Sequence, residues 1–142
     1  MKKYAITCAF LLLAFVAFAQ NTIYYNSSPT LLWDPVLPEL AGDVIEYEVY
    51  LWDMANGDPL IQPITAFISF GTTALTQIPL TFTYRAEWAV AVRTKLTDGG
   101  ANVGYSALSH SVVSEDAGGS PFYYVPLSGL PLAPASLRDS GT

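Results

Sequence analysis

Residues 88–109 read WAVAVRTKLTDGGANVGYSALS, and this stretch predicts more about the fold than any other part of the chain. Trp88, Val90 and Val92 are spaced two apart, so in an extended strand they lie on one face. The segment TDGGAN that follows, at residues 97–102, is rich in turn-forming residues and ends the strand. We therefore predict a strand, a turn-rich loop and the start of a second strand.

The same alternation occurs upstream, where Ile45, Tyr47, Val49 and Leu51 are also spaced two apart. Asn56 and Gly57 are expected to form a tight hairpin that brings the next strand back beside this one. No stretch sustains a helical period of 3.6 over three turns, so the fold is predicted to be all-β. The strands predicted before residue 88 are residues 31–34, 45–52, 60–64 and 72–78.

Gly104, Ser106 and Ser109 form a G-x-S-x-x-S motif, and with the strand before it this motif resembles the last two strands of a fibronectin type III domain. Leu31, Trp33 and Pro35 are similar to the second strand of that family, which ends in a buried tryptophan. The resemblance covers residues 28–115, close to the ~100 residues of an immunoglobulin-like sandwich. It implies a seven-stranded antiparallel β-sandwich at residues 28–116, with an arm at each end. The core residues that we expect are Trp33, Tyr47, Val49, Trp88, Val90 and Val92.

Trp88 departs from the family pattern. It stands where the family has a tyrosine whose hydroxyl ties down a corner of the sandwich. An indole N–H donates a hydrogen bond but cannot accept one. We therefore expect the tie to be altered, with Tyr84 as its candidate replacement.

The first 19 residues have the pattern of a secretory signal peptide. Lys2 and Lys3 precede an apolar run, and Ala17-Phe18-Ala19 has the small-x-small pattern of a cleavage site. An uncleaved anchor is the alternative, but the run is shorter than the ~20 residues that a membrane span needs. Cleavage would remove Cys8, the only cysteine, and leave four basic residues against twelve acidic ones. We expect a secreted or cell-surface protein that has no disulfide, binds no nucleic acid and is not held in a membrane after cleavage.

Two arms flank the predicted sandwich, at residues 20–27 and 117–142. The C-terminal arm is rich in Gly, Pro and Ser, as linkers are, yet Arg138 and Asp139 are its only charges among many apolar residues. Disordered tails usually combine low hydrophobicity with high charge. We therefore expect this tail to pack, either on its own sandwich or on another molecule, and both arms could add a strand to a sheet edge. The candidate partner-binding residues of the arms are Tyr24, Tyr25, Phe122, Tyr123, Tyr124 and Leu127.

The strand at residues 45–52 also predicts an outward face. With its apolar set inward, Glu46, Glu48, Tyr50 and Trp52 point outward, over two alanines of the neighbouring strand. The same pairing places Arg93 near the two glutamates. Tyr50 and Trp52 are expected to be exposed. They are either a platform for a sugar ring or a partner's side chain, or aromatics that stabilise the sheet.

Patterns that would indicate catalysis or metal binding are weak. His110 is the only histidine, and neither a cysteine beyond Cys8 nor a G-x-S-x-G serine accompanies it. Asp53, Asn56 and Asp58 alternate as calcium ligands do, but no bidentate glutamate completes the loop. We predict that the protein is not an enzyme and has no cofactor and no metal site.

The sequence favours a secreted, non-enzymatic structural or adhesive module that acts through protein–protein contacts. Its partner would be another protein or copies of itself, assembled through the terminal arms. The alternative is a small carbohydrate-binding module that holds a polysaccharide with Tyr50 and Trp52. A secreted hydrolase is a third class, which the lone histidine disfavours.

Overall fold

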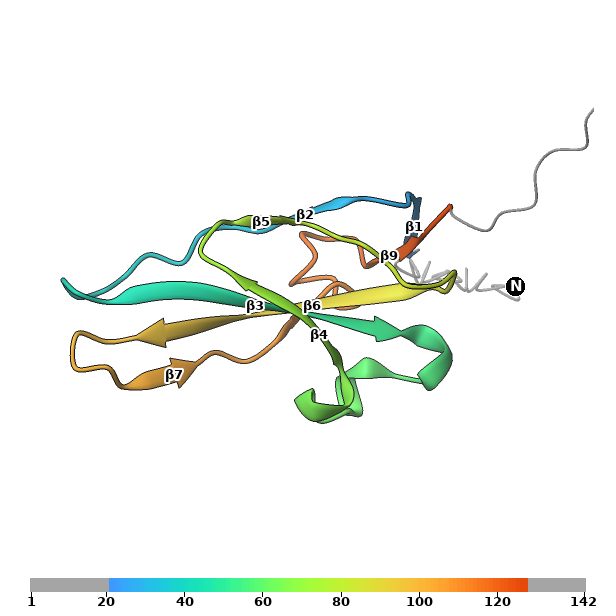
Figure 1. Ribbon diagram of the computed structural model, residues 1–142. Helices are drawn as coiled ribbons and strands as arrows, with labels where there is room; N and C mark the ends of the chain where they lie inside the picture. The colour runs from blue at the N-terminus through green and yellow to red at the C-terminus, as the bar shows by residue number, and fades with distance from the viewer. Residues whose placement is uncertain (1–20, 128–142) are drawn as a thin grey trace, which may run out of the picture.

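Two ten-residue strands with alternating side chains form the centre of the structure. The computed structural model describes residues 21–127; the predicted signal peptide and residues 128–142 of the predicted tail lie outside this part (Figure 1). β3 (Val44–Asp53) pairs antiparallel with β6 (Trp88–Thr97) along its whole length. Because the pair carries apolar side chains on both faces, both faces need cover.

The larger sheet is built outward from this pair. β4 (Ile68–Thr73) lies beside β3, and β7 (Val103–Tyr105), β8 (Ser109–His110) and β9 (Phe122–Val125) follow one another along β6. β1 (Thr22–Tyr25) pairs parallel with β9 and forms the outermost strand on that side. The small sheet consists of β2 (Thr30–Leu32) and β5 (Gln77–Pro79), which pair antiparallel.

The small sheet covers one face of the larger sheet (Figure 1). The main core between them contains Leu31, Val49, Leu51, Leu80, Trp88, Val90 and Tyr124, each at most 7% exposed. Of the predicted core residues, Tyr47, Val49, Trp88 and Val90 are buried, whereas Trp33 and Val92 are partly buried at its margin. The prediction of an all-β fold is confirmed, and the two packed sheets are consistent with a β-sandwich.

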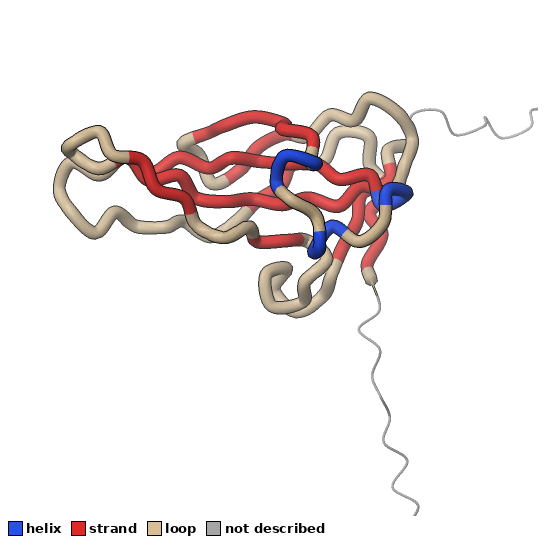
Figure 2. The backbone as a smooth tube through the Cα atoms, turned by 90° about the horizontal axis from the view of Figure 1, so that it is seen from below, coloured by secondary structure: helices blue, strands red, loops and turns tan. Residues whose placement is uncertain are grey.

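The opposite face of the larger sheet is also covered. The ring of Phe67 lies 5.0 Å from that of Trp52 and 6.4 Å from that of Tyr50, between centroids. We term this second group the outer cluster; it contains Tyr50, Trp52, Phe67, Ala89, Ala91 and Tyr123. Figure 2, seen from below, shows the short helical turns that precede Phe67 lying across the strands.

The prediction of a hairpin at Asn56-Gly57 is wrong. The chain between β3 and β4 forms three 3-10 turns: η1 (Met54–Asn56), η2 (Pro59–Ile61) and η3 (Ile64–Ala66). The side chains of Asp53 and Asp58 cap the first two turns by accepting N–H bonds of 2.9 Å. Only Gly57 of the pair has a positive φ, and the two-residue turn requires this of both residues. Residues 60–64 are therefore not a strand, and β4 lies beside β3 instead.

Other strands also differ from the prediction. The strand expected at residues 72–78 is divided, since Thr73 ends β4 and Gln77 begins β5 in the other sheet. β9, which we expected in an arm outside the sandwich, joins the larger sheet of its own chain. The described residues contain nine strands: β2 to β8 lie within residues 28–116, where seven strands were expected, and the arms add β1 and β9, which pair parallel.

A corner tie is present, with an indole as the donor. Trp88 Nε1 donates to the carbonyl of Tyr84 at 3.2 Å, and the Tyr84 hydroxyl donates to Asp53 Oδ2 at 2.7 Å. The bond to Asp53 raises the pKa of Tyr84. Tyr84 thus links the start of β6 to the end of β3.

Candidate binding groove

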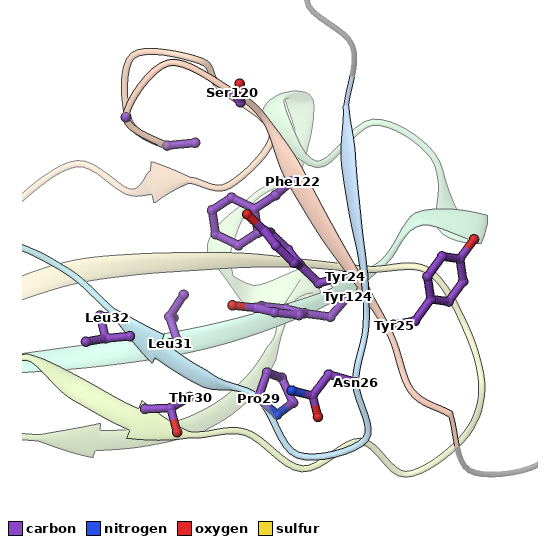
Figure 3. A pocket seen from close by; sticks show the side chains of 12 residues that line it. Tyr24, Tyr25, Asn26, Pro29, Thr30, Leu31, Leu32, Ser120, Phe122 and Tyr124 are labelled. Atoms are coloured by element: carbon purple, nitrogen blue, oxygen red, sulfur yellow. The ribbon is translucent and has the colours of Figure 1, made fainter.

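A groove runs along one side of the sandwich, between β2 and the edge formed by β9 and β1 (Figure 3). Three adjoining cavities of ≈660, ≈410 and ≈130 Å³ make it up, and Leu32 and Ala117 line all three. We term it the edge groove. Its largest cavity is lined by Tyr24, Tyr25, Asn26, Pro29, Thr30, Leu31, Leu32, Ala117, Gly118, Ser120, Phe122 and Tyr124.

Aromatic rings form the wall on the β9 side. The rings of Phe122 and Tyr124 lie 5.5 Å apart, and the ring of Tyr24 lies 5.8 and 5.9 Å from them, between centroids. In Figure 3 the three rings lie on the side of β1 and β9 that faces Leu31, whereas Tyr25 lies on the other side. Burial raises the pKa of Tyr124, so its hydroxyl stays protonated at neutral pH. The wall is therefore uncharged and largely apolar.

The backbone of β2 forms the opposite wall, and one of its edges is open. Leu80 N–H donates to Pro29 O at 2.8 Å, and Trp33 N–H donates to Thr76 O at 3.1 Å. Because backbone groups alternate in direction along an antiparallel ladder, those of Thr30 and Leu32 point away from β5. Within the described residues, β2 pairs with β5 alone. The edge of β2 beside the groove thus has N–H and C=O groups free for another strand.

The far edge of the small sheet is different. Pro79 of β5 stands opposite Thr30, so its backbone nitrogen lies on the side away from β2. Proline has no N–H, and proline is one of the residues that protect exposed sheet edges. Of the two edges of this sheet, the one facing the groove is therefore better able to receive a strand.

The other end of the groove is polar. The cavity of ≈410 Å³ is lined by Asp34, Thr94, Ser106, Ser109 and Asp116, among others. Trp33 also lines it, and its buried Nε1 has no hydrogen-bond partner in the described part of the chain. The lining therefore changes from aromatic to polar along the groove. Such a groove suits a bound peptide segment that carries both apolar and polar side chains.

His110, the one histidine, is a packed residue at the edge of the outer cluster. Its ring lies 5.9 Å from that of Phe67, between centroids, and its backbone N–H donates to Asp116 Oδ2 at 2.8 Å. Burial lowers the pKa of His110, and the charges of Asp116 and Asp58 oppose this shift. A neutral, packed imidazole contributes to the stability of the fold.

Four of the eight predicted partner-binding residues meet at the edge groove: Tyr24, Tyr25, Phe122 and Tyr124. Leu127, 41% exposed, is the last described residue. The remaining three, Tyr50, Trp52 and Tyr123, belong to the outer cluster and are at most 8% exposed. The prediction that Tyr50 and Trp52 are exposed is therefore wrong, because Phe67 covers them. They do not present the open platform on which the carbohydrate-binding alternative depends.

The groove also contains residues that the sequence analysis did not predict to bind a partner, chiefly Leu31 and Leu32 of β2 and the loop at residues 116–120. β2 has only three residues, and nothing in so short a strand indicates which edge stays open. The one available signal was the absence of charged residues from residues 21–33 and 117–127, which line the largest cavity.

Two ion pairs lie on the outward face beyond the outer cluster. Arg93 bonds Glu48 at 2.7 Å, as predicted, while Glu46 bonds Lys95 at 2.8 Å. The Tyr50 hydroxyl donates to Glu48 at 2.6 Å, and this bond, together with Arg93, lowers the pKa of Glu48. Because these side chains bond one another, they stabilise the β3–β6 pair. Few of their hydrogen-bond donors and acceptors remain for a ligand.

Residues 21–127 contain no group of three or more His, Cys, Asp or Glu side chains placed to hold a metal ion. Within the same residues, no helix has the length and apolar character needed to cross a membrane. No family model, curated protein or solved structure matches the chain.

Proposed function

We propose that this protein is a secreted, non-enzymatic module that acts through protein–protein contacts, holding an extended segment of its partner in the edge groove. The observation that carries the proposal is the open edge of β2 beside a wall of aromatic rings. An incoming strand would bond the backbone of Thr30 and Leu32 and place alternate side chains against the rings. Strand addition of this kind is a common mode of peptide recognition.

The proposal includes a fibronectin type III-like arrangement. On this proposal β2 and β5 take the places of strands B and E, and β4, β3, β6 and β7, which are neighbours in that order, take those of strands C′, C, F and G. In immunoglobulin-like sandwiches strand A belongs to the sheet of B and E. Here β1 pairs with β9 of the larger sheet instead. The place beside β2 is thereby left for a strand from another molecule.

The remaining parts of the proposal come from the sequence. The N-terminal pattern of residues 1–19 supports secretion, and a structural or adhesive role at the cell surface fits a small binding domain. The excess of acidic residues argues against nucleic acid as the partner.

A peptide selection tests the proposed function. The probe is a phage-displayed library of random seven-residue peptides, panned on the purified protein. We expect enrichment of peptides with apolar residues at alternate positions. Leu32→Pro removes an N–H that faces the groove without removing a bond to β5. It should weaken binding of the selected synthetic peptide about tenfold, as the loss of one hydrogen bond and its neighbouring contacts would.

Two further variants make the result interpretable. Leu32→Glu places a charge in the groove and replaces Leu32→Pro if that variant folds poorly. Leu75→Glu is the matched control, because Leu75 is exposed to a similar extent, 64% against 68%, and does not line the groove. The proposal fails if no peptide is enriched, or if folded Leu32 variants bind the selected peptide as tightly as Leu75→Glu does.

A further inference from the structure

A second open edge belongs to β1, the outermost strand of the larger sheet on its side. Thr22 N–H donates to Pro121 O at 2.8 Å, and Asn26 N–H donates to Val125 O at 3.1 Å. Alternate residues of a parallel strand bond the same neighbour, so the backbone groups of Tyr24 also face β9. Those of Ile23 and Tyr25 face outward, where no described strand meets them.

Nothing in β1 protects this edge. Natural edge strands often carry a lysine, a proline or a bulge that discourages pairing, and the sequence TIYY has none of these. The side chains of Ile23, Tyr24 and Tyr25 are 41%, 49% and 60% exposed. Figure 3 shows Tyr24 and Tyr25 on opposite sides of the strand, so a pairing partner would cover apolar surface on both faces.

The chain segments that contain β1 and its neighbour β9 carry no charged side chain, although the charges of Glu87 and Asp58 act on Tyr123 of β9. Residues 21–33 and 117–127 contain no Asp, Glu, Lys or Arg, in a chain with a formal net charge of −6. Two copies of an acidic chain repel each other where their charged surfaces meet. A second copy can therefore approach this face with little electrostatic cost.

We propose that β1 pairs antiparallel with β1 of a second copy, in a two-fold symmetric dimer whose larger sheets become continuous. A two-fold axis makes the same patch serve both copies. With Tyr24 opposite Tyr24 of the other copy, Ile23 of each chain stands opposite Tyr25 of the other. These are the residues whose backbone groups face outward, so the register forms about four N–H···O bonds. The dimer goes beyond the proposed function, since it leaves the edge of β2 open.

Cysteine trapping tests the register. In a Cys8→Ser background, Tyr24→Cys introduces the only cysteine of the chain. In the proposed register the two Tyr24 residues form a non-hydrogen-bonded pair with Cα atoms about 4.5 Å apart, within the range of a disulfide. Mild oxidation should give a disulfide-linked dimer on a non-reducing gel. Tyr84→Cys is the matched control, because Tyr84 is also 49% exposed and lies elsewhere. Equal cross-linking of the two variants would overturn the register.

Sedimentation tests the dimer itself. The protein should associate with rising concentration, whereas Ile23→Pro should stay monomeric, because it removes an outward N–H and no bond to β9. Ile23→Lys, which places a protective charge on the edge, serves as a second variant with the same expectation. A wild-type protein that stays monomeric at millimolar concentration, or folded variants that associate as well as wild type, would overturn the dimer. Leu32→Pro should still dimerise, which separates this inference from binding in the groove.

Discussion

Trp33 shows how a single buried atom affects the stability of this domain. Its ring packs 5.3 Å from that of Tyr47, between centroids, but its buried Nε1 has no hydrogen-bond partner among the described residues. A buried donor without a partner costs about 1–3 kcal/mol. Trp88 is the opposite case, since its Nε1 donates to the Tyr84 carbonyl. Replacing each tryptophan by phenylalanine should therefore have opposite effects on the free energy of unfolding.

We expect Trp33→Phe to leave the free energy of unfolding unchanged or to raise it by up to ~1 kcal/mol. Phenylalanine has no N–H, so the cost of burying the unpaired indole N–H is removed. The phenylalanine ring is smaller and packs less well, which offsets part of this gain. Trp88→Phe is the control and should lower the free energy of unfolding by ~1–3 kcal/mol. Urea denaturation measures both. A clear loss in Trp33→Phe, equal to that in Trp88→Phe, would mean that the Trp33 indole has a partner in solution.

His110 predicts a dependence of stability on pH. Because its pKa is lowered in the folded state, the unfolded chain binds a proton more readily just below pH 6.5. The free energy of unfolding should therefore fall as the pH is lowered from about 7.5 to about 5.5. The lowered pKa of Glu48 acts in a different window, since the stability that it contributes is lost only as the pH falls below its ordinary value of 4.5.

His110→Gln should remove the part of the pH dependence that lies near pH 6.5. Urea denaturation of wild type and variant across that range gives the comparison. If both lose stability in parallel as the pH falls, His110 is not the group responsible.

The outward residues of β3 show the limit of sequence reasoning for single residues. Alternation correctly separated the set containing Val49 from the set containing Tyr50, because pleating alone determines the face. Whether a face is covered depends on a distant segment, and Phe67 lies in irregular chain without a periodic signal. For this reason Tyr50 and Trp52 were assigned to the correct face but expected to be exposed.

Among the elements, the long strands could be predicted and the short ones could not. β3 and β6 are long enough for alternation to mark them as strands, and their antiparallel pairing, which we had expected, is present in the structure. Asn56-Gly57 was misleading because aspartate caps and prolines turn the following chain into 3-10 turns. β9 was not predicted as part of the sandwich because it lies in a region rich in Gly and Pro. Its two buried tyrosines, one on each face, attach it to the larger sheet.

The segment between β3 and β4 gives a prediction at the scale of elements. Phe67→Ala removes the ring that covers Tyr50 and Trp52, so it should lower the free energy of unfolding by ~3–5 kcal/mol. It should also shift tryptophan fluorescence to longer wavelength as Trp52 becomes hydrated. Ile61→Ala, in the same segment and 77% exposed, is the control and should change neither measurement. An unshifted, fully stable Phe67→Ala protein would mean that the segment does not cover the sheet.

At the scale of the whole molecule, β1 and β2 each leave an edge unpaired within the described residues, and both strands lie in a segment, residues 21–33, that has no charged residue in an acidic chain. The edge of β2 faces the groove and is open to a foreign strand, while the edge of β1 is complementary to itself. The sequence predicted strand addition by the arms, and four of its candidate residues line the groove. It could not predict which edges stay open, because that depends on β1 joining β9 and leaving β2 with a single neighbour.

Amide hydrogen exchange along β2, resolved by residue, tests the central claim most directly. In the free protein the amides of Thr30 and Leu32 should exchange fast, whereas that of Trp33, bonded to Thr76, should be protected. A saturating amount of the selected seven-residue peptide should protect Thr30 and Leu32 as well. Slow exchange at Thr30 and Leu32 before the peptide is added, or fast exchange that persists after it is bound, would contradict an open edge that receives a strand.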